Sequence, residues 1–389
     1  MIPYGRQSIS EDDIAAVVDV LRSDFLTQGP VIEQFEKAVC ECVNARFAVA
    51  VSNGTAALHI ACRALGLGKG DNLWTSPITF VASANCALYC GANVDFVDID
   101  TRTFNMSVEA LEKKLRQAKD YNKLPKVVVP VHLAGLSCDM EAIARLSKQY
   151  GFSIIEDASH AIGGRYKNTE IGCCQFSDIT IFSFHPVKII TTGEGGMAVS
   201  NNRALVEKMR LLRTHGITRD PDYMTHALDG AWYYQQIDLG FNYRITDFQA
   251  ALGISQLKRL DKFVKRRHEL AARYDTLLSG LPVSPQFRPD TCYSGMHLYV
   301  IRIQTDKVKK SHRQIFEEMR KAGIGVNLHY IPVHTQPYYS SLGFKSGDYP
   351  EAELYYTEAI SLPLYPDLTE EEHEKIVDNL ARILEITKI

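Results

Sequence analysis

The sequence predicts an α/β fold, with a large α/β/α domain around a mostly parallel sheet and a smaller C-terminal α+β domain. Short apolar runs alternate with helical patterns between residues 47 and 157, which is typical of a parallel sheet covered by helices. A long, highly charged helical pattern follows over residues 246–278, and strand and helix patterns begin again after Pro282. Two units joined by a helix also suit a chain of 389 residues.

The N-terminal segment should form two helices before the first strand. Ser10-Glu11-Asp12-Asp13 has the pattern of a capping box, and the apolar residues after it recur at helical spacing. A second helix is expected over 31–43, directly after Gly29-Pro30. We therefore expect a helical arm at the start of the large domain, which we assign to residues 1–245.

Alternating elements should build the core of this large domain. Because parallel strands need crossover connections, the helices between them are expected to cover the faces of one sheet. Strands are predicted at 47–52, 72–76, 94–99, 126–132 and 153–157, and near 178–183 and 196–200. Helices are predicted at 55–66, 80–91, 108–118 and 140–151.

One long helix, within residues 246–280, is expected to connect the large domain to a small domain over 281–389. The small domain should be α+β, because its strand patterns are few and separated by helical ones. Its predicted elements are a strand at 298–303, a helix around 311–322, a strand near 325–329, and terminal helices around 349–359 and 369–387.

The composition excludes several classes of protein. The net charge of −3 comes from mixed signs without a basic block, so nucleic acid is not an expected partner. No apolar stretch approaches the ~20 residues that span a bilayer, and the N-terminus lacks the pattern of a signal peptide, so no membrane association is expected. Nine scattered cysteines without zinc-ligand spacing indicate reduced thiols in a cytoplasmic protein, and no metal site.

One lysine, Lys188, stands among apolar residues where a buried strand should leave the core. A lysine that snorkels to water would be the simpler interpretation of this residue alone. A buried amine, however, loses hydration, so its pKa falls and it can act as the nucleophile in Schiff-base chemistry. Asp157 ends another predicted strand, where carboxylates usually face a ligand crevice, and Ser183 precedes the lysine. A lysine, an acid and a hydroxyl are the groups that a pyridoxal phosphate site needs.

The turn at residues 52–59 is a candidate phosphate cradle. A predicted strand ends there, Gly54 permits a close approach, and the amides of Thr55 and Ala56 open a helix. Free N–H groups and the helix dipole favour an anion at such a point, although many strand–helix turns look alike. Phe80 follows another strand end, where its ring could either stack on a planar cofactor or pack in the core.

Together these motifs resemble the DegT/DnrJ/StrS family of sugar-nucleotide aminotransferases. The resemblance covers essentially the whole chain and rests above all on S-F-H-P-V-K (183–188) with T-T-G-E-G-G (191–196), and on N-Y-R-I-T-D-F-Q-A-A-L-G (242–253). It implies fold type I of the pyridoxal-phosphate-dependent transferases, with pyridoxal 5′-phosphate as cofactor. It also implies a homodimer with shared active sites.

The resemblance assigns roles to individual residues. Lys188 matches the Schiff-base lysine, and Asp157 matches the acid at the pyridine nitrogen. His160 stands where many members have glutamine near the phenolic oxygen of the cofactor, so the tuning of the Schiff base stays open. The other matches are the phosphate turn of Gly54, Thr55 and Ala56, the phosphate-binding Ser183, the ring-contacting Phe80, and Asn242, which is expected to reach the cofactor phosphate from the partner subunit.

Three segments are most similar to the branch of the family that serves pseudaminic acid synthesis: Leu26–Gly29, Asp157–His160 and Asn327–Pro332. This similarity implies transamination at C4 of a UDP-linked 4-keto-6-deoxy-N-acetylamino sugar, with L-glutamate as amino donor. The product would be UDP-4-amino-4,6-dideoxy-N-acetyl-β-L-altrosamine. The residues then expected to contact the sugar nucleotide are Tyr4, Asp24, Phe25, Leu26, Thr27, Asn327, Leu328, His329 and Tyr330.

Three alternatives remain open at this point. An aminotransferase for another keto sugar, of the perosamine or bacillosamine type, would have the same cofactor site. A sugar dehydratase of the same fold would carry histidine in place of Lys188. A non-catalytic regulator that binds pyridoxal phosphate is the third, and the complete set of lysine, acid and phosphate residues argues against it.

Overall fold

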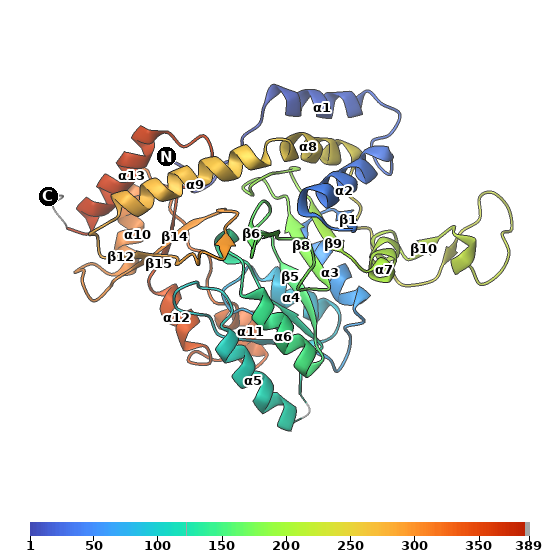
Figure 1. The fold of residues 1–389 in the computed structure, drawn as a ribbon, viewed down its shortest axis with the longest axis horizontal. Helices are drawn as coiled ribbons and strands as arrows, with labels where there is room; N and C mark the ends of the chain where they lie inside the picture. Colours follow the sequence, from blue (N-terminus) through green and yellow to red (C-terminus); the bar gives the residue numbers. More distant parts are fainter. Residues whose placement is uncertain (122, 386–389) are drawn as a thin grey trace.

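The computed structural model describes residues 1–121 and 123–385 and is built around one seven-stranded sheet (Figure 1). The strand order is β1-β9-β8-β5-β4-β2-β3, and every neighbouring pair from β8 to β3 is parallel. Strand β9 is antiparallel to both of its neighbours. The strands are β1 (Phe47–Val51), β2 (Asn72–Thr75), β3 (Asn93–Phe96), β4 (Val127–Val129), β5 (Ser153–Asp157), β8 (Ile179–Ser183) and β9 (Gly196–Ser200). The predicted mostly parallel sheet is confirmed.

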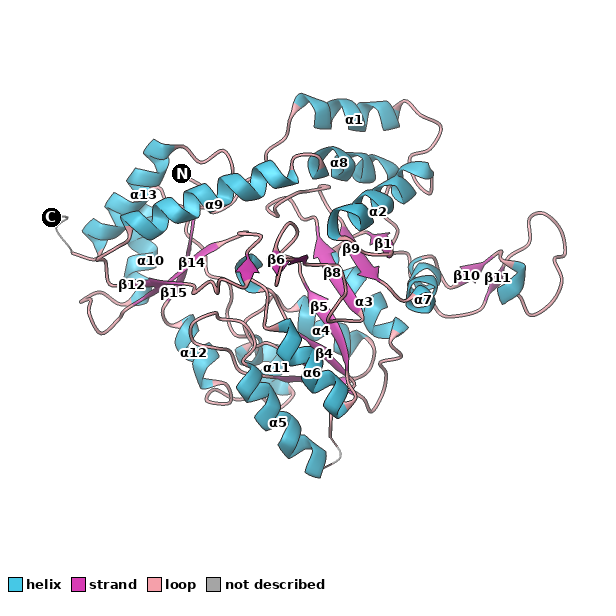
Figure 2. Cartoon of the chain, viewed as in Figure 1, coloured by secondary structure: helices cyan, strands magenta, loops and turns pink. Residues whose placement is uncertain are grey.

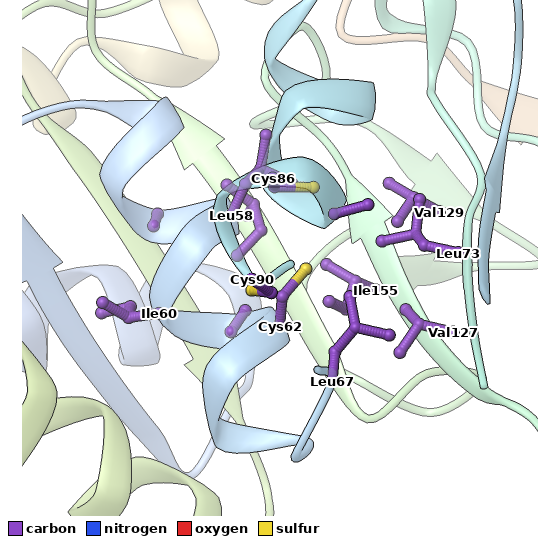
Figure 3. Packing of buried hydrophobic residues seen from close by; sticks show 14 of the residues in the cluster. Leu58, Ile60, Cys62, Leu67, Leu73, Cys86, Cys90, Val127, Val129 and Ile155 are labelled. Carbon is purple, nitrogen blue, oxygen red and sulfur yellow. The ribbon is translucent and has the colours of Figure 1, made fainter. Parts of the chain in front are cut away.

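Helices cover both faces of this sheet. Successive side chains of a strand point to opposite faces, so Val49 and Val51 of β1 pack with α3 while Ala48 and Ala50 pack with α2. Figure 3 shows Leu58 and Cys62 of α3 facing the sheet residues Val127, Val129 and Ile155. The helices are α2 (Pro30–Val43), α3 (Gly54–Ala64), α4 (Ala82–Tyr89), α5 (Val108–Asp120), α6 (Met140–Tyr150) and α7 (Arg203–Arg213).

The capping box predicted at Ser10 is present at the start of α1 (Glu11–Leu21). Helix α1 packs on α8 (Asp247–Leu257), with the buried Asp13 accepting hydrogen bonds from Gln256 Nε2 at 2.7 Å and from Arg259. The single helix predicted over residues 246–278 is wrong, because Arg259 leaves the helical conformation (φ −108°, ψ 5°) and separates α8 from α9 (Leu260–Leu277). At this break the Arg259 guanidinium donates to the carbonyl of Ser8 and forms an ion pair with Asp13. Figure 2 shows α8 and α9 as two separate helices.

The C-terminal part has its own three-stranded antiparallel sheet, in the order β12-β14-β15. Its strands and helices are β12 (Val283–Pro285), β14 (Tyr299–Ile303), β15 (Ala359–Leu362), α10 (His312–Lys321), α11 (Pro337–Ser341), α12 (Pro350–Tyr356) and α13 (Glu370–Ile383). Residues 386 and 387 of the last predicted helix lie outside the described residues.

Two predictions for this part are wrong. Residues 325–329 do not form a strand, because the amide of Gly325 donates to the carbonyl of Ile2 and only Asn327 bridges to β15. Residues 359–362 form β15, whereas the sequence predicts that residue 359 ends a helix. The division of the chain at residues 245 and 280 stays a prediction.

Smaller strands complete the structure. One sheet has the order β13-β6-β7, from Cys292–Tyr293, Arg165–Tyr166 and Thr169–Glu170. The hairpin of β10 (Ile217–Thr218) and β11 (Gln235–Gln236) belongs to a segment, residues 217–241, that projects from the body (Figure 1). Within the described residues, no helix combines the length and the apolar character needed to cross a membrane.

Candidate active site

A cavity of about 880 Å³ opens where several strands of the large sheet end at the same edge. Asp157 is the last residue of β5 and Ser183 the last of β8, while Val51 ends β1. Both Val51 and Ser183 pair with Gly196 of β9, so the turn after β1 lies beside Ser183. The polar ends of these strands therefore converge on one space, as is usual for ligand sites of open α/β sheets.

Lys188 enters this cavity from a turn after β8, in which its N–H donates to the carbonyl of His185 at 2.9 Å. Its side chain is half-buried and has no hydrogen-bond or ion-pair partner in the described part of the chain. Burial lowers the pKa of the Lys188 amine to about 8, and the charge of Asp157 acts in the opposite direction. A substantial fraction of this amine is therefore unprotonated just above neutral pH.

Asp157 lines the same cavity with only 5% of its surface exposed. Ser83 Oγ donates to Asp157 Oδ2 at 2.6 Å, and Ser159 donates to Oδ1 through both its hydroxyl (2.6 Å) and its N–H (3.1 Å). A carboxylate held in this way can accept a further hydrogen bond, as an acid beside a pyridine nitrogen must do.

The turn after β1 forms a cradle at the N-terminus of α3. The amides of Gly54 and Thr55 have no partner among the described residues, as expected for a first helical turn. The prediction that the Ala56 amide is also free is wrong. The side chain of Asn53 caps the helix, and its Oδ1 accepts a hydrogen bond from the Ala56 N–H at 2.8 Å. A Cβ at residue 54 would lie 3.1 Å from Cβ of Ser183, so only glycine leaves this space open.

Phe80 and Tyr330 form an aromatic edge of the cavity. Phe80 is 59% exposed, which contradicts packing in the core as its role, and its ring centroid lies 6.3 Å from that of Tyr330. Tyr330 Oη lies 3.1 Å from Nε2 of His160, and the two rings are stacked. The cavity thus offers a flat apolar face near the amine and the carboxylate, as a planar cofactor requires.

Three buried imidazoles, those of His160, His297 and His329, line the same cavity as the amine. Burial and the charge of Lys188 lower the pKa of His329 to about 3 and hold the pKa of His160 well below its usual range. The pKa of His297 is lowered well below its usual range by burial first, with the neighbouring charges adding to this effect. All three rings are therefore neutral at neutral pH, which keeps the site free of competing cations.

No sequence pattern marks His297 as a site residue. It lies at the start of an apolar run and no local motif marks it. Its ring centroid lies 4.5 Å from that of His160, and Nδ1 of both rings is buried without a hydrogen-bond partner. Only the fold reveals this pair. Other lining residues that the sequence did not suggest are Tyr89, Glu194, Tyr243 and Thr79.

The cavity collects most of the predicted site residues within one chain. Tyr4 contacts His329, with 5.3 Å between the ring centroids. The predicted residues that line the cavity are Tyr4, Gly54, Thr55, Ala56, Phe80, Asp157, His160, Ser183, Lys188, Asn327, Leu328, His329 and Tyr330.

Five predicted residues lie elsewhere in the chain. Asp24, Phe25, Leu26 and Thr27 are exposed and are held by the start of α8, whose Asp247 donates its N–H to the Leu26 carbonyl at 3.0 Å. Asn242 is also exposed and pairs with Thr214. These residues do not line the cavity of their own chain.

Known proteins similar to this chain include members of an aminotransferase family. The DegT/DnrJ/EryC1/StrS aminotransferase family model matches residues 7–381. The spore coat polysaccharide biosynthesis protein SpsC of Bacillus subtilis is 38% identical over 387 residues, which cover 98% of this chain and 97% of SpsC.

Solved structures agree over nearly the whole chain. PseC of Helicobacter pylori, an aminotransferase involved in the biosynthesis of pseudoaminic acid, has a TM-score of 0.90 at 32% identity and covers 99% of both chains. The sugar aminotransferase Spr1654 of Streptococcus pneumoniae in its PLP form has a TM-score of 0.88 at 30% identity, over 99% of this chain and 98% of that chain.

Proposed function

The chain belongs to the DegT/DnrJ/EryC1/StrS aminotransferase family, a family of enzymes that depend on pyridoxal phosphate, and we propose that it aminates C4 of a UDP-linked 4-keto-6-deoxy-N-acetylamino sugar. L-Glutamate is the proposed donor, and UDP-4-amino-4,6-dideoxy-N-acetyl-β-L-altrosamine the proposed product. The observation that carries the proposal is the convergence of Lys188, Asp157 and the Gly54–Ser183 cradle on one cavity.

The residues of the cavity fit pyridoxal phosphate. The open amides of Gly54 and Thr55, with the Ser183 hydroxyl, would hold the phosphate. Asp157 would accept the hydrogen bond of the pyridine nitrogen, and Phe80 would lie against the ring. When bound, the cofactor supplies an electron sink for the carbon that loses its proton.

Lys188 is the proposed acid and base. Because burial lowers the pKa of its amine to about 8, Nζ can take a proton and return it near neutral pH. His160 and Tyr330 form part of the cavity wall, are joined by a hydrogen bond, and add no charge to it. We propose that His329, Tyr330 and Tyr4 orient the sugar against this amine.

The similarity to PseC supports the choice of sugar, since that protein is described as acting in pseudoaminic acid biosynthesis. The neighbouring segment Asn327–Tyr330 lines the cavity and, with Tyr4, is our proposed contact for the sugar ring. Asp24, Phe25, Leu26 and Thr27 do not line it. We propose that they contact the sugar nucleotide in the cavity of a second subunit.

A homodimer with shared sites is proposed for two reasons. Among the described lining residues, Lys188 is the only lysine and there is no arginine, whereas a diphosphate and a dicarboxylate each need cationic partners. The projecting segment 217–241 also exposes Trp232 (75%) and Leu239 (71%), which is an apolar surface suited to a partner. Asn242 would then reach the cofactor phosphate of the partner subunit's site.

Product analysis tests this function. The purified protein, loaded with pyridoxal phosphate, is incubated with L-glutamate and a panel of UDP- and GDP-linked keto sugars. We expect the UDP-linked 4-keto-6-deoxy-N-acetylamino sugar to be aminated at C4, and Lys188→Ala to abolish turnover while Lys69→Ala, at an exposed position, does not. Amination of only a perosamine- or bacillosamine-type precursor would overturn the choice of sugar, and a fully active Lys188→Ala variant would overturn the site.

A further inference from the structure

Two serine hydroxyls hold the two oxygens of Asp157. Ser83, in the first turn of α4, donates to Oδ2, and Ser159 donates to Oδ1, both at 2.6 Å. Ser83 is fully buried and Asp157 is 5% exposed. Hydrogen bonds of this length to a buried carboxylate are strong and directional, so they restrict its rotation.

The direction of the Ser83 hydrogen bond follows from its neighbours. A serine hydroxyl has one hydrogen, and its acceptors here are Asp157 Oδ2 at 2.6 Å and the Phe80 carbonyl at 3.4 Å. The shorter, charged acceptor takes the hydrogen. Thr79 Oγ1, 2.7 Å from Ser83 Oγ, must then be the donor between these two hydroxyls. A chain of donors therefore runs from Thr79 through Ser83 to Asp157.

The acceptor capacity of Asp157 is almost used up. A carboxylate has roughly four lone-pair sites. Oδ1 accepts from the N–H and the hydroxyl of Ser159, and Oδ2 accepts from Ser83. Among the described residues no other donor reaches the side chain, so one site remains, and it is on Oδ2.

We infer that Ser83 and Ser159 are positioning residues that fix the plane of the Asp157 carboxylate and leave Oδ2 as the acceptor for the pyridine nitrogen of the cofactor. This inference rests on the proposed role of Asp157. A carboxylate turns about a single bond, so either of the two short hydroxyl bonds restricts the same rotation, whereas the longer bond from the Ser159 N–H, at 3.1 Å, restricts it less. The two serines are therefore partly redundant, and removing both should cost more than the two single changes combined.

Binding of pyridoxal phosphate to the apoprotein tests the inference. Ser83→Ala and Ser159→Ala should each raise the dissociation constant about threefold or less, and the double variant should raise it about tenfold to thirtyfold, since binding must then immobilise the carboxylate. The N–H of residue 159 remains in every variant, so binding is weakened and not abolished. Ser177→Ala is the matched control, because Ser177 donates to Glu156, which precedes Asp157 on the same strand but does not line the cavity.

A second measurement separates positioning from general damage to the fold. The pH dependence of the visible absorption of the bound cofactor should change in the double variant and stay unchanged in Ser177→Ala, while thermal unfolding reports any common loss of stability. Equal binding in the double variant and the wild type would overturn the inference, as would single effects that simply multiply. Asp157→Asn distinguishes the two proposals: if this variant keeps wild-type binding and absorption, the role of Asp157 itself fails.

Discussion

Gly54 approaches Ser183 so closely that a methyl group at residue 54 would meet Cβ of Ser183 at 3.1 Å and its Oγ at 3.4 Å. The two residues belong to different elements, α3 and β8, and they face each other because Val51 and Ser183 pair with the same residue of β9. The strand register thus creates an open space at the N-terminus of a helix, where an anion is favoured.

Gly54→Ala should weaken binding of pyridoxal phosphate by about tenfold with little change in stability. The methyl group would occupy the space between the turn and Ser183, whereas the gain in helix propensity of up to about 1 kcal/mol offsets the crowding. The dissociation constant and the melting temperature of the apoprotein are the measurements. In the control, Gly68→Ala, the added Cβ meets no atom within 4 Å. Unchanged cofactor binding in Gly54→Ala would contradict the assignment of the cradle.

Lys188→Met should stabilise the apoprotein at neutral pH. The pKa of Lys188 is about 8 in the folded chain against 10.5 without burial, so between these values the unfolded chain binds more protons and stability rises with pH. Below pH 8 the folded protein must hold a charged amine in the cavity. The difference between these two pKa values corresponds to a free energy of roughly 3 kcal/mol. Because the side chain is only half-buried, solvent screening reduces the expected destabilisation to about 1–2 kcal/mol.

The free energy of unfolding of Lys188→Met should therefore exceed that of the wild type most at pH 7, and this difference should shrink as the pH rises from 8 to 10.5. Denaturant unfolding of the two apoproteins across this range measures it. Lys69→Met, at an exposed position, should show no such trend. A stability difference that does not depend on pH would show that burial does not shift the pKa of this amine.

Tyr330→Phe should reduce turnover by at least about tenfold. The change removes the hydroxyl that lies 3.1 Å from Nε2 of His160, and it leaves both ring nitrogens of that buried histidine without a partner. An unsatisfied buried group costs about 1–3 kcal/mol, so stability should also fall.

Tyr339→Phe provides the comparison for Tyr330→Phe. Its hydroxyl donates to Asn85 Oδ1 at 2.5 Å, away from the cavity. We expect a similar loss of stability in the two variants and a loss of turnover only in Tyr330→Phe. Equal effects on turnover would mean that the hydroxyl of Tyr330 acts through the fold alone.

The sequence predicts the large sheet well because its strands are buried on both faces and appear as short apolar runs. It fails where distant residues decide the backbone. At the break between α8 and α9, the Arg259 side chain forms an ion pair with the distant Asp13. Within residues 325–329, Asn327 makes only an isolated bridge to Ser361, so no strand ladder forms. Strand β15 follows α12 without a glycine or proline between them, so no local signal separates the two.

In the cavity, too, the residues that local sequence patterns mark can be predicted, and those brought in by distant segments cannot. Lys188, Asp157 and Ser183 end strands or follow them closely, so their convergence at one sheet edge could be predicted from sequence order. His297 could not, because its contact with His160 joins two segments far apart in the chain. Asp24–Thr27 and Asn242 are exposed and lie outside the cavity of their own chain, so their role in a site shared with a second subunit stays a proposal.

Glu36 joins three elements beneath the sheet edge. This carboxylate of α2 is 5% exposed and accepts hydrogen bonds from the Ala50 amide of β1 at 2.9 Å and from Arg213 at 2.7 Å and Arg210 at 3.1 Å, both on α7. Arg213 and Arg210 also donate to the carbonyls of β1. The edge strand β1, which leads into the turn at Gly54, is thus anchored to α2 and α7 by one buried carboxylate.

Glu36→Gln should lower the free energy of unfolding by about 2–3 kcal/mol. Removing the Glu36 charge leaves the guanidinium of Arg213 without its carboxylate partner. The expected loss of free energy is smaller than for a fully buried pair, because the second partner, Arg210, has a side chain that is 47% exposed. Denaturant unfolding measures the loss, and Glu33→Gln, at an exposed position of the same helix, should change it by less than about 0.5 kcal/mol. Since Glu36 does not line the cavity, turnover per folded molecule should stay unchanged. A loss of turnover without a loss of stability would mean that Glu36 shapes the cradle instead of anchoring the strand.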